Sequence, residues 1–263
     1  MKSFGLKVSF AAVALAAAAA PAVAADEATD YGKVSAYVAV ESDYRYRGIS
    51  QNDRQFTPEG SINWTGPYGF YAGTWLAKTN WGGGTPSLEM DIYGGKHIDL
   101  DGTDLNIEAY YYSYPDYNAT AAGGGIPTAK ASYFEMQGYL SHTFDKLTLT
   151  ATGAFSPEWS LGGKEGWYGA ATAAYALTDW FSLSATFGHQ WVKLAPSDYS
   201  HWDIGGTFTY KSWTLDVRYV GNDIGKAKCS SYWMGGNSMG SISNACTATV
   251  KANLTYNIAD LFG

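Results

Sequence analysis

The chain has 263 residues, with 17 Lys and Arg against 24 Asp and Glu, and this net charge of −7 excludes the broad basic surface that a nucleic-acid partner needs. Its length fits one domain. Aromatic residues make up 16% of the chain and charged residues only 16%. A secreted β-sandwich could share this composition, but a membrane β-barrel explains it more specifically, because aromatic side chains are wanted at both membrane interfaces.

The first 24 residues have the pattern of a secretory signal peptide. Lys2 and Lys7 precede a short apolar segment at 10–20, and Ala22-Val23-Ala24 offers a cleavage site. Pro21 ends the apolar run too early for an uncleaved transmembrane helix, and no second long apolar run follows. We therefore expect a signal peptide at 1–24 and one domain at 25–263. Losing Lys2 and Lys7 lowers the basic count from 17 to 15, against 24 acidic residues.

Apolar and polar residues alternate with a period of two along most of the remaining chain, which predicts β-strands. In 213–219, for example, Trp, Leu, Val and Tyr alternate with Thr, Asp and Arg. Each run is close to the roughly 9–11 residues that a tilted strand needs to cross a bilayer. We predict twelve strands, at 33–47, 57–65, 69–80, 87–98, 104–114, 131–144, 147–156, 167–177, 181–192, 201–210, 213–221 and 247–257.

Short and long connections alternate between these strands. The short ones lie at 66–69, 99–103, 145–146, 177–180 and 211–212, and the long ones at 48–56, 81–86, 115–130, 157–166, 193–200 and 222–246. An even number of strands with this alternation is typical of an outer-membrane barrel, with short periplasmic turns and longer extracellular loops. The expected fold is therefore all-β, a transmembrane antiparallel up-and-down β-barrel with both chain ends on the periplasmic side.

Within the first predicted strand, Tyr44 and Tyr46 share one face, and Asp43, Arg45 and Arg47 share the other. We expect the tyrosines to face lipid in an aromatic girdle and the charged residues to face the lumen. The expected girdles consist of Trp64, Phe144, Trp180, Phe181, Tyr210 and Trp213 by the short turns, and of Tyr44, Tyr46, Trp167, Trp191, Trp202 and Tyr219 by the long loops.

The same alternation, continued along every strand, predicts which charged residues line the lumen, because a base on the lipid face would cost about 2–4 kcal/mol at mid-membrane. The predicted lumen residues are Glu41, Asp43, Arg45, Arg47, Glu59, Glu89, Asp91, Glu108, Glu135, Asp203, Asp216, Arg218 and Lys251. We expect Arg45 and Arg47 to face Glu89, Asp91 and Glu108. Two interpretations stay open: a salt-bridge network that fills the barrel, or a conduit whose acidic excess favours cations.

Catalytic, metal and cofactor sites find little support in the sequence. No serine stands at either of the two positions that follow each of the four histidines, and the histidines lie on separate strands. His201 and Asp203 share a face and could titrate together, but they are better explained as polar residues at a pore mouth. Residues 99–104 resemble a calcium loop faintly, with wrong glycine spacing, so a tight turn is expected. We predict no enzyme, no cofactor and no metal.

The two cysteines, Cys229 and Cys246, bracket the longest predicted loop. In an exported protein they are expected to form a disulfide. Closing a loop of about 18 residues is worth roughly 3 kcal/mol in the chain-entropy model. This bond either protects an exposed loop from proteases or folds that loop over the mouth of the pore.

Residues 44–51, Tyr-Arg-Tyr-Arg-Gly-Ile-Ser-Gln, resemble the Y-R-F-R-G-I-S-Q signature of the TorF family, bacterial porins of formerly unknown function. Segments 69–75, 88–95 and 112–115 are similar to that family's later blocks, and the paired cysteines before the final strand also fit. The resemblance implies an outer-membrane barrel and a pore, without a defined substrate. One departure is the C-terminus, where Gly263 follows the Phe262 that the barrel assembly machinery is expected to recognise.

We therefore predict a porin of the bacterial outer membrane, a passive diffusion channel for small solutes with a cationic preference. Its expected partners are outer-membrane lipids, lipopolysaccharide, the barrel assembly machinery and the small solutes; association into trimers is left open. The alternative is a closed structural or adhesive barrel that acts through loops 115–130 and 222–246. A membrane enzyme is the third possibility, and it requires a serine or carboxylate beside a histidine.

Overall fold

The structure of the protein is a computed structural model that describes residues 32–81, 86–118, 130–160, 164–193, 198–226, 228–229 and 244–258. The predicted signal peptide at 1–24 and the C-terminal pair Phe262-Gly263 lie outside the described residues. Within the described ranges, no helix is both long enough and apolar enough to cross a bilayer.

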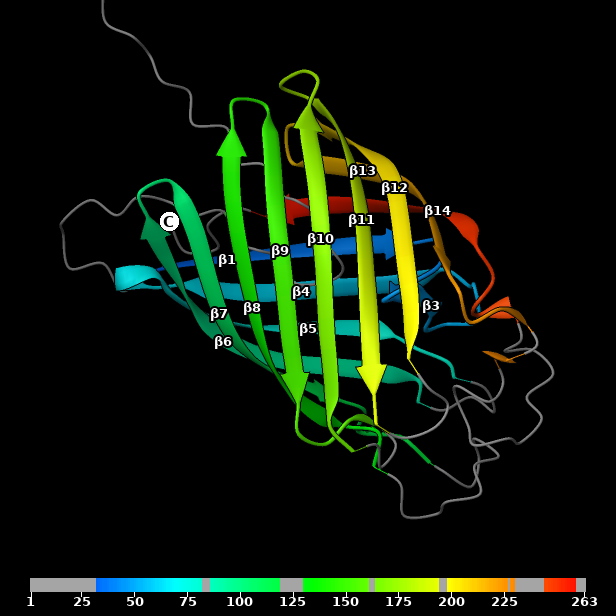
Figure 1. Cartoon of the computed structure of the whole chain (residues 1–263). Helices are drawn as coiled ribbons and strands as arrows, with labels where there is room; N and C mark the ends of the chain where they lie inside the picture. The colour runs from blue at the N-terminus through cyan, green and yellow to red at the C-terminus, as the bar shows by residue number, and fades with distance from the viewer. Residues whose placement is uncertain are drawn as a thin grey trace, which may run out of the picture.

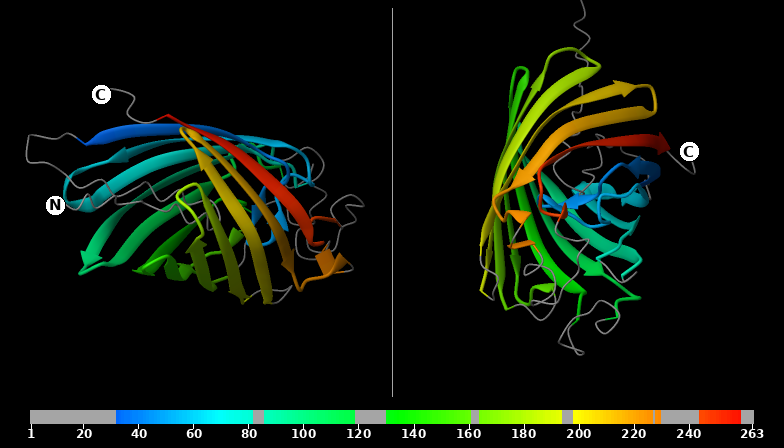
Figure 2. Two further views of the ribbon diagram at one scale, coloured as in Figure 1. Left: turned by 90° about the horizontal axis from the view of Figure 1, so that it is seen from above. Right: turned by 90° about the vertical axis from the view of Figure 1, so that its right-hand side faces the viewer.

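Twelve antiparallel strands form a closed barrel, which confirms the predicted fold class (Figure 1). Each wall strand pairs with the wall strand that follows it in sequence, and β1 closes the barrel by pairing with both β4 and β14. Figure 2 shows how strongly these strands tilt. The wall strands are β1 (Lys33–Glu41), β4 (Thr57–Thr65), β5 (Phe70–Lys78), β6 (Leu88–Leu100), β7 (Thr103–Ser113), β8 (Tyr133–Phe144), β9 (Leu147–Ser156), β10 (Gly166–Ala176), β11 (Phe181–Val192), β12 (Tyr199–Tyr210), β13 (Trp213–Asn222) and β14 (Thr249–Ile258).

The two ends of the barrel differ in their connections. The short turns gather at one end, toward the upper left in Figure 1, where β1 also begins and β14 ends. Asp101, Asp145 and Lys211 adopt positive φ in the two-residue turns, as tight hairpin turns require. The turn between β4 and β5 contains a 3₁₀ turn, η1 (Pro67–Gly69). We call these two ends the short-turn end and the long-loop end.

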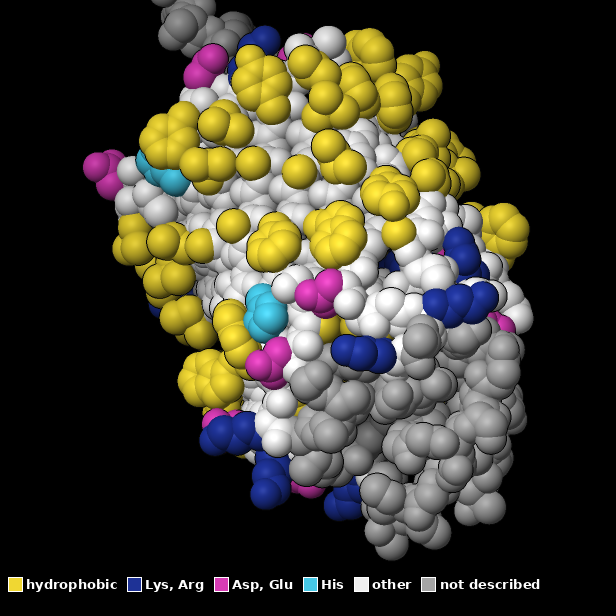
Figure 3. Space-filling model, turned by 45° about the vertical axis from the view of Figure 1, so that its right-hand side comes forward, with side chains coloured by type: hydrophobic (Ala, Val, Ile, Leu, Met, Phe, Trp, Pro, Cys, Tyr) yellow, Lys and Arg dark blue, Asp and Glu magenta, His cyan; other side chains and the backbone are white. Residues whose placement is uncertain are grey.

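The outer face of the wall is apolar. Figure 3 shows hydrophobic side chains spread over one face of the wall, whereas most charged ones lie toward the long-loop end. The exposed aromatics include, as predicted, Trp64, Phe144, Trp180, Tyr210 and Trp213 at the short-turn end and Trp167, Trp191, Trp202 and Tyr219 toward the long-loop end. An apolar band between two aromatic girdles is what a transmembrane barrel presents to lipid.

The prediction of the first strand, at 33–47, is wrong beyond Glu41. The wall strand β1 ends there, and residues 42–56 leave the wall and form a small hairpin, β2 (Arg45–Tyr46) paired with β3 (Ile49–Ser50). Arg47 and Gly48, both at positive φ, make the turn of this hairpin. The alternation of 43–47 is a property of β-structure in general, so it could not distinguish a wall strand from a hairpin inside the wall.

Candidate functional site

Residues 42–56, which we call the plug, cross the lumen from β1 to the opposite side of the barrel. Arg47 in the plug bonds to Glu135 on β8 and to Gln190 on β11. Going round the wall from β1, β8 lies five strands away in one direction and β11 four strands away in the other. The plug therefore spans the barrel interior rather than lying along the strand from which it starts.

Arg47 is the best-connected side chain of the plug. Its guanidinium donates from Nη1 to Glu135 Oε1 at 3.0 Å and from Nη2 to Glu135 Oε2 at 2.8 Å, a bidentate pair. The same group lies over the Tyr168 ring, 3.9 Å from its centroid, and near Trp159. Arg47 is only 4% exposed, so its charge is buried together with that of its partner. We call this pair the Arg47–Glu135 bolt.

Arg45 has a different role, because it bonds within the plug. Its Nε donates to Asp43 Oδ2 at 2.7 Å, and its Nη1 donates to the Gly48 carbonyl at 3.0 Å. Ser50 donates to the other oxygen of Asp43. Arg45 thus holds the hairpin in shape. The expectation that both arginines face the acids of β6 and β7 is wrong: Arg45 pairs with Asp43 and Arg47 pairs with Glu135.

Tyr44 and Tyr46 also correct the sequence interpretation, since neither lies in the outer girdle. Tyr44 is 2% exposed, donates its hydroxyl to Glu89 on β6 and packs edge-on against Trp75 on β5. Burial, reinforced by the Glu89 carboxylate, raises the pKa of Tyr44 well above its usual value, so its hydroxyl stays a donor. Tyr46 packs edge-on against Tyr112 on β7. Both tyrosines fasten the plug to the interior of the wall.

The inner surface of β5–β8 is an aromatic wall that sequence reasoning missed. Its buried members, with those of the plug and loops, are Tyr44, Tyr71, Trp75, Trp81, Tyr93, Tyr110, Tyr112, Tyr114 and Tyr133. Tyr93 stacks on Tyr110, and Tyr112 stacks on Tyr133. The parity that placed Glu89 and Glu108 inside also places these rings inside. The alternation of the sequence therefore indicates inward-facing tyrosines as well as inward-facing acids on these strands.

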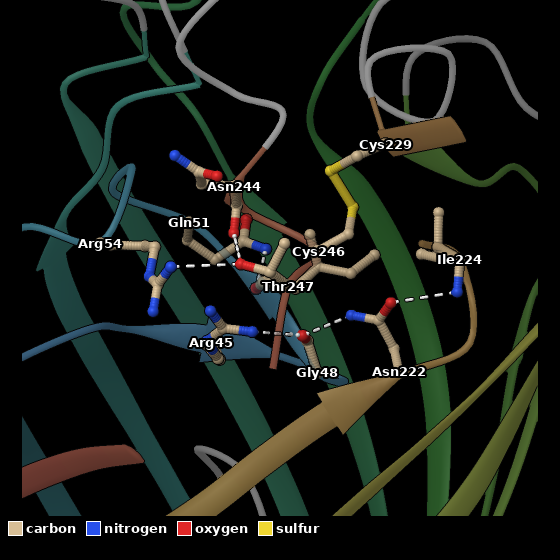
Figure 4. The surroundings of a disulfide bond; sticks show 11 residues. Arg45, Gly48, Gln51, Arg54, Asn222, Ile224, Cys229, Asn244, Cys246 and Thr247 are labelled. Carbon is tan, nitrogen blue, oxygen red and sulfur yellow. Dashed lines mark hydrogen bonds between the residues drawn. A yellow bond between two sulfur atoms is a disulfide. The ribbon is translucent and has the colours of Figure 1, made fainter. Parts of the chain in front are cut away.

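The far side of the plug rests against the disulfide between Cys229 and Cys246 (Figure 4). Ile49, at the tip of the plug, is buried in one cluster with both cysteines. Ser50 donates its backbone N–H to the Ala245 carbonyl at 2.9 Å, and Asn222 on β13 donates to the Gly48 carbonyl at 2.8 Å. The predicted disulfide is therefore present, and it borders the plug at the long-loop end.

At Gly48 the backbone of the plug packs closely against β12 and β13. A Cβ atom there would lie 2.7 Å from Cβ of His201 on β12 and 3.0 Å from the Gly221 carbonyl oxygen on β13. Gly48 also has a φ of +83°, which L side chains rarely adopt. Only glycine therefore allows this close approach.

The other predicted lumen bases pair with acids across neighbouring strands. Arg218 on β13 donates from Nε to Asp216 at 2.6 Å and also bonds to Asp203 on β12. Lys251 on β14 bonds to Glu41 at the end of β1. The four predicted lumen bases, two of which are the arginines of the plug, thus form ion pairs with five of the nine predicted lumen acids.

The remaining four acids, Glu59, Glu89, Asp91 and Glu108, form what we call the acidic wall on β4, β6 and β7. In the described part of the chain, no lysine or arginine forms an ion pair with any of them. Neutral groups bond to them instead: Asn253 to Glu59 at 2.7 Å, Tyr44 to Glu89 at 3.2 Å, Tyr110 to Asp91 at 2.9 Å and Tyr71 to Glu108 at 3.0 Å. The acidic excess is thus concentrated on one side of the lumen.

Hydroxyl groups line the barrel between the plug and the short turns. Thr143 and Thr148, beside the turn between β8 and β9, lie 2.9 Å apart, and Ser141 lies 2.8 Å from Thr150. Thr172 and Thr186 make a similar pair between β10 and β11. This part of the interior is lined largely by hydroxyl groups, with the His97–Asp104 pair beside the turn between β6 and β7.

The histidines make local contacts. His201 bonds to Tyr168 and not to Asp203, which pairs with Arg218. His189 Nδ1 lies 2.9 Å from Ser200 Oγ across β11 and β12, a pairing of distant residues that no motif could suggest. A nucleophilic serine needs a base that a third group orients, and no carboxylate among the described residues bonds to His189.

Metal-binding geometry is also missing from the described residues, which contain no group of three or more His, Cys, Asp or Glu side chains placed to hold an ion. The faint calcium-loop resemblance at 99–104 proves to be a turn, in which Asp99 accepts the backbone N–H of Gly102 at 2.8 Å.

The barrel resembles solved outer-membrane channels in fold. The NanC porin matches with a TM-score of 0.54 and 7% identity over 87% of this chain and 100% of that one. The COG4313 outer membrane channel from Pseudomonas putida F1 matches with a TM-score of 0.52 and 10% identity over 90% of this chain and 100% of that one. The KdgM porin matches with a TM-score of 0.52 and 7% identity over 87% of this chain and 99% of that one. These identities show the shared fold alone.

No curated protein matches the sequence. Residues 25–258 match a family described as "bacterial protein of unknown function (Gcw_chp)". The match covers nearly all of the predicted mature domain, including the plug, the acidic wall and both cysteines. The chain therefore belongs to the bacterial Gcw_chp family.

Proposed function

We propose that this protein is an outer-membrane porin of the TorF type, exported with a cleaved signal peptide, which lets small polar solutes diffuse passively. The observation that carries the proposal is the pairing of an apolar outer face with a polar interior around a closed wall of twelve strands. A soluble barrel of this size would not expose an apolar band between two aromatic girdles. The channel-like fold of its structural neighbours agrees with this proposal.

The acidic wall supports the finer proposal that the channel prefers cations. Glu59, Glu89, Asp91 and Glu108 have no basic partner among the described residues, whereas the bases of the lumen are already paired. With the plug in place, Glu89, Asp91 and Glu108 are at most 3% exposed, so we expect a passing cation to meet these carboxyl groups only after the plug moves aside.

Replacing the acidic wall is expected to reduce this preference. Removing one unit charge about 5 Å from a passing ion changes its energy by roughly 0.8 kcal/mol in water, a factor of about four. In the variant E89Q/D91N/E108Q, the permeability ratio of K⁺ to Cl⁻ should therefore fall by at least this factor. Planar-bilayer reversal potentials in a KCl gradient measure it.

Glu165→Gln is the matched control, because Glu165 lies outside the wall strands and pairs with the exposed Lys193. This variant should keep the wild-type ratio. An unchanged ratio in the triple variant would refute the cation preference while leaving the porin proposal intact. Absence of conductance in both wild type and a variant with a released plug would refute the porin proposal itself.

The many bonds that hold the plug to the wall favour a second candidate, a closed structural or adhesive barrel that acts through its outer loops. Most of loops 115–130 and 222–246 lies outside the described residues. This alternative predicts that releasing the plug gives no current and that activity follows the loops. For either function we propose insertion by the barrel assembly machinery among outer-membrane lipids and lipopolysaccharide, in an oligomeric state that the single chain does not define.

A further inference from the structure

A groove of about 680 Å³ indents the outer face of the barrel over β5–β8. Its floor includes two small residues in register on neighbouring strands, Gly94 on β6 and Ala109 on β7. Larger side chains on the same face, such as Phe70 and Ile107, form its rims. The groove therefore follows from side-chain size at outward positions of the wall.

The groove has a direction along the wall. One end, with Met136 and Ala109, lies farther from the short turns. The other end meets the turn between β4 and β5, where Trp64, Pro67 and Tyr68 line it. The apolar end thus points into the membrane, and the aromatic end lies at the expected periplasmic interface, where Trp and Tyr side chains sit at headgroup level.

Lys96 lies at this interfacial end of the groove. It alternates with Gly95 and His97 and so faces outward, with its Nζ 4.8 Å from the centroid of the Phe70 ring. Of the acids beside the turn between β6 and β7, Asp99 accepts the Gly102 N–H and Asp104 pairs with His97, and among the described residues no carboxylate forms an ion pair with Lys96. A cation on the outer face of a membrane barrel is unfavourable unless an anion or water reaches it.

We propose that this groove binds one anionic phospholipid of the periplasmic leaflet, with its phosphate on Lys96 and one acyl chain along Gly94 and Ala109. The groove matches the orientation of a lipid in that leaflet. Its cation and aromatic residues lie at the water side, where the headgroup is, and its small apolar residues lie toward the membrane centre, where the acyl chains are. The inference rests on the proposed membrane location but is independent of any transport.

The test is native mass spectrometry of the whole protein in a neutral detergent, with phosphatidylglycerol, phosphatidylethanolamine or lipid A added at equal concentration. Wild type should retain one phosphatidylglycerol in preference to the other two. A lysine close to the headgroups contributes about a fivefold gain in affinity for anionic lipid, so Lys96→Gln should weaken retention by about that factor. Ala109→Leu, which fills the groove and keeps the cation, should weaken it too.

Lys78→Gln is the matched control, because Lys78 is exposed at the other end of β5 and does not line the groove. Heat-dependent migration in SDS gels verifies that each variant keeps its barrel. Equal retention by wild type and Lys96→Gln, or preference for phosphatidylethanolamine or lipid A, would overturn the proposal. Loss of lipid retention with normal conductance, or the reverse, separates it from the porin proposal.

Discussion

Replacing Arg47 by methionine is expected to open the barrel. The bolt joins the plug to the wall opposite β1, and both of its charges are buried. Removing one member of a buried ion pair costs about 3–5 kcal/mol, because the other charge is left uncompensated. Here the closed state bears that cost, since Glu135 regains water when the plug moves away. The open population should rise by about two to four orders of magnitude.

Single-channel recording in planar bilayers measures this change as a higher open probability. Arg218→Met is the matched control: it removes the same side chain from an equally buried ion pair, but Arg218 bonds to β11, β12 and β13 and makes no hydrogen bond to the plug. It should destabilise the wall and leave the plug closed. Equal open probabilities in the Arg47→Met and wild-type proteins would contradict a gating role for the bolt.

The double variant R47M/E135M sharpens this test. It removes both charges and leaves no uncompensated carboxylate, and such apolar replacements are often neutral or stabilising. If the bolt closes the barrel mainly through its ion pair, the double variant should still open more readily than wild type, but less readily than Arg47→Met. The difference between the two variants then measures the penalty of the unpaired Glu135.

The wall of the barrel was largely readable from the sequence, because alternation and connection length are local signals. The alternating run at 213–219 lies within β13, and the short connection at 145–146 is the two-residue turn between β8 and β9. Every predicted strand has a counterpart in the wall, with ends displaced by a few residues. Lipid on one side and a polar interior on the other impose this pattern on each strand separately.

The plug was not readable, because its position depends on contacts far apart in the chain. Arg47 and Glu135 are 88 residues apart, and Arg47 and Gln190 are 143 apart. Alternation at 43–47 fits a wall strand and an internal hairpin equally well. The turn offered one hint: Gly48 ends the run, and a positive φ at Arg47 and Gly48 reverses the chain. The four lumen bases could be named from parity, but not which acid each one pairs with.

The disulfide is expected to hold the plug from the side opposite the bolt. The variant C229S/C246S loses the constraint on a loop of about 18 residues, which is worth roughly 3 kcal/mol in the chain-entropy model. It also loses the covalent bond that holds together the two cysteines against which Ile49 packs. It should open more often than wild type and be cut sooner by external proteases at the long-loop end. Bilayer recording and limited proteolysis measure the two effects. Faster proteolysis with unchanged opening would assign the bond to loop protection alone.

The burial of both cysteines gives this prediction a second, independent measurement. Cys229 is 0% exposed and Cys246 is 1% exposed, and the tip of the plug packs against them. A dithiol must reach one sulfur of the bond to form a mixed disulfide, so a seated plug should slow its attack. In Arg47→Met the plug leaves its seat more often, and the reduction rate should rise with the open probability. If reduction proceeds equally fast in both proteins, the bolt and the disulfide do not act on one moving segment.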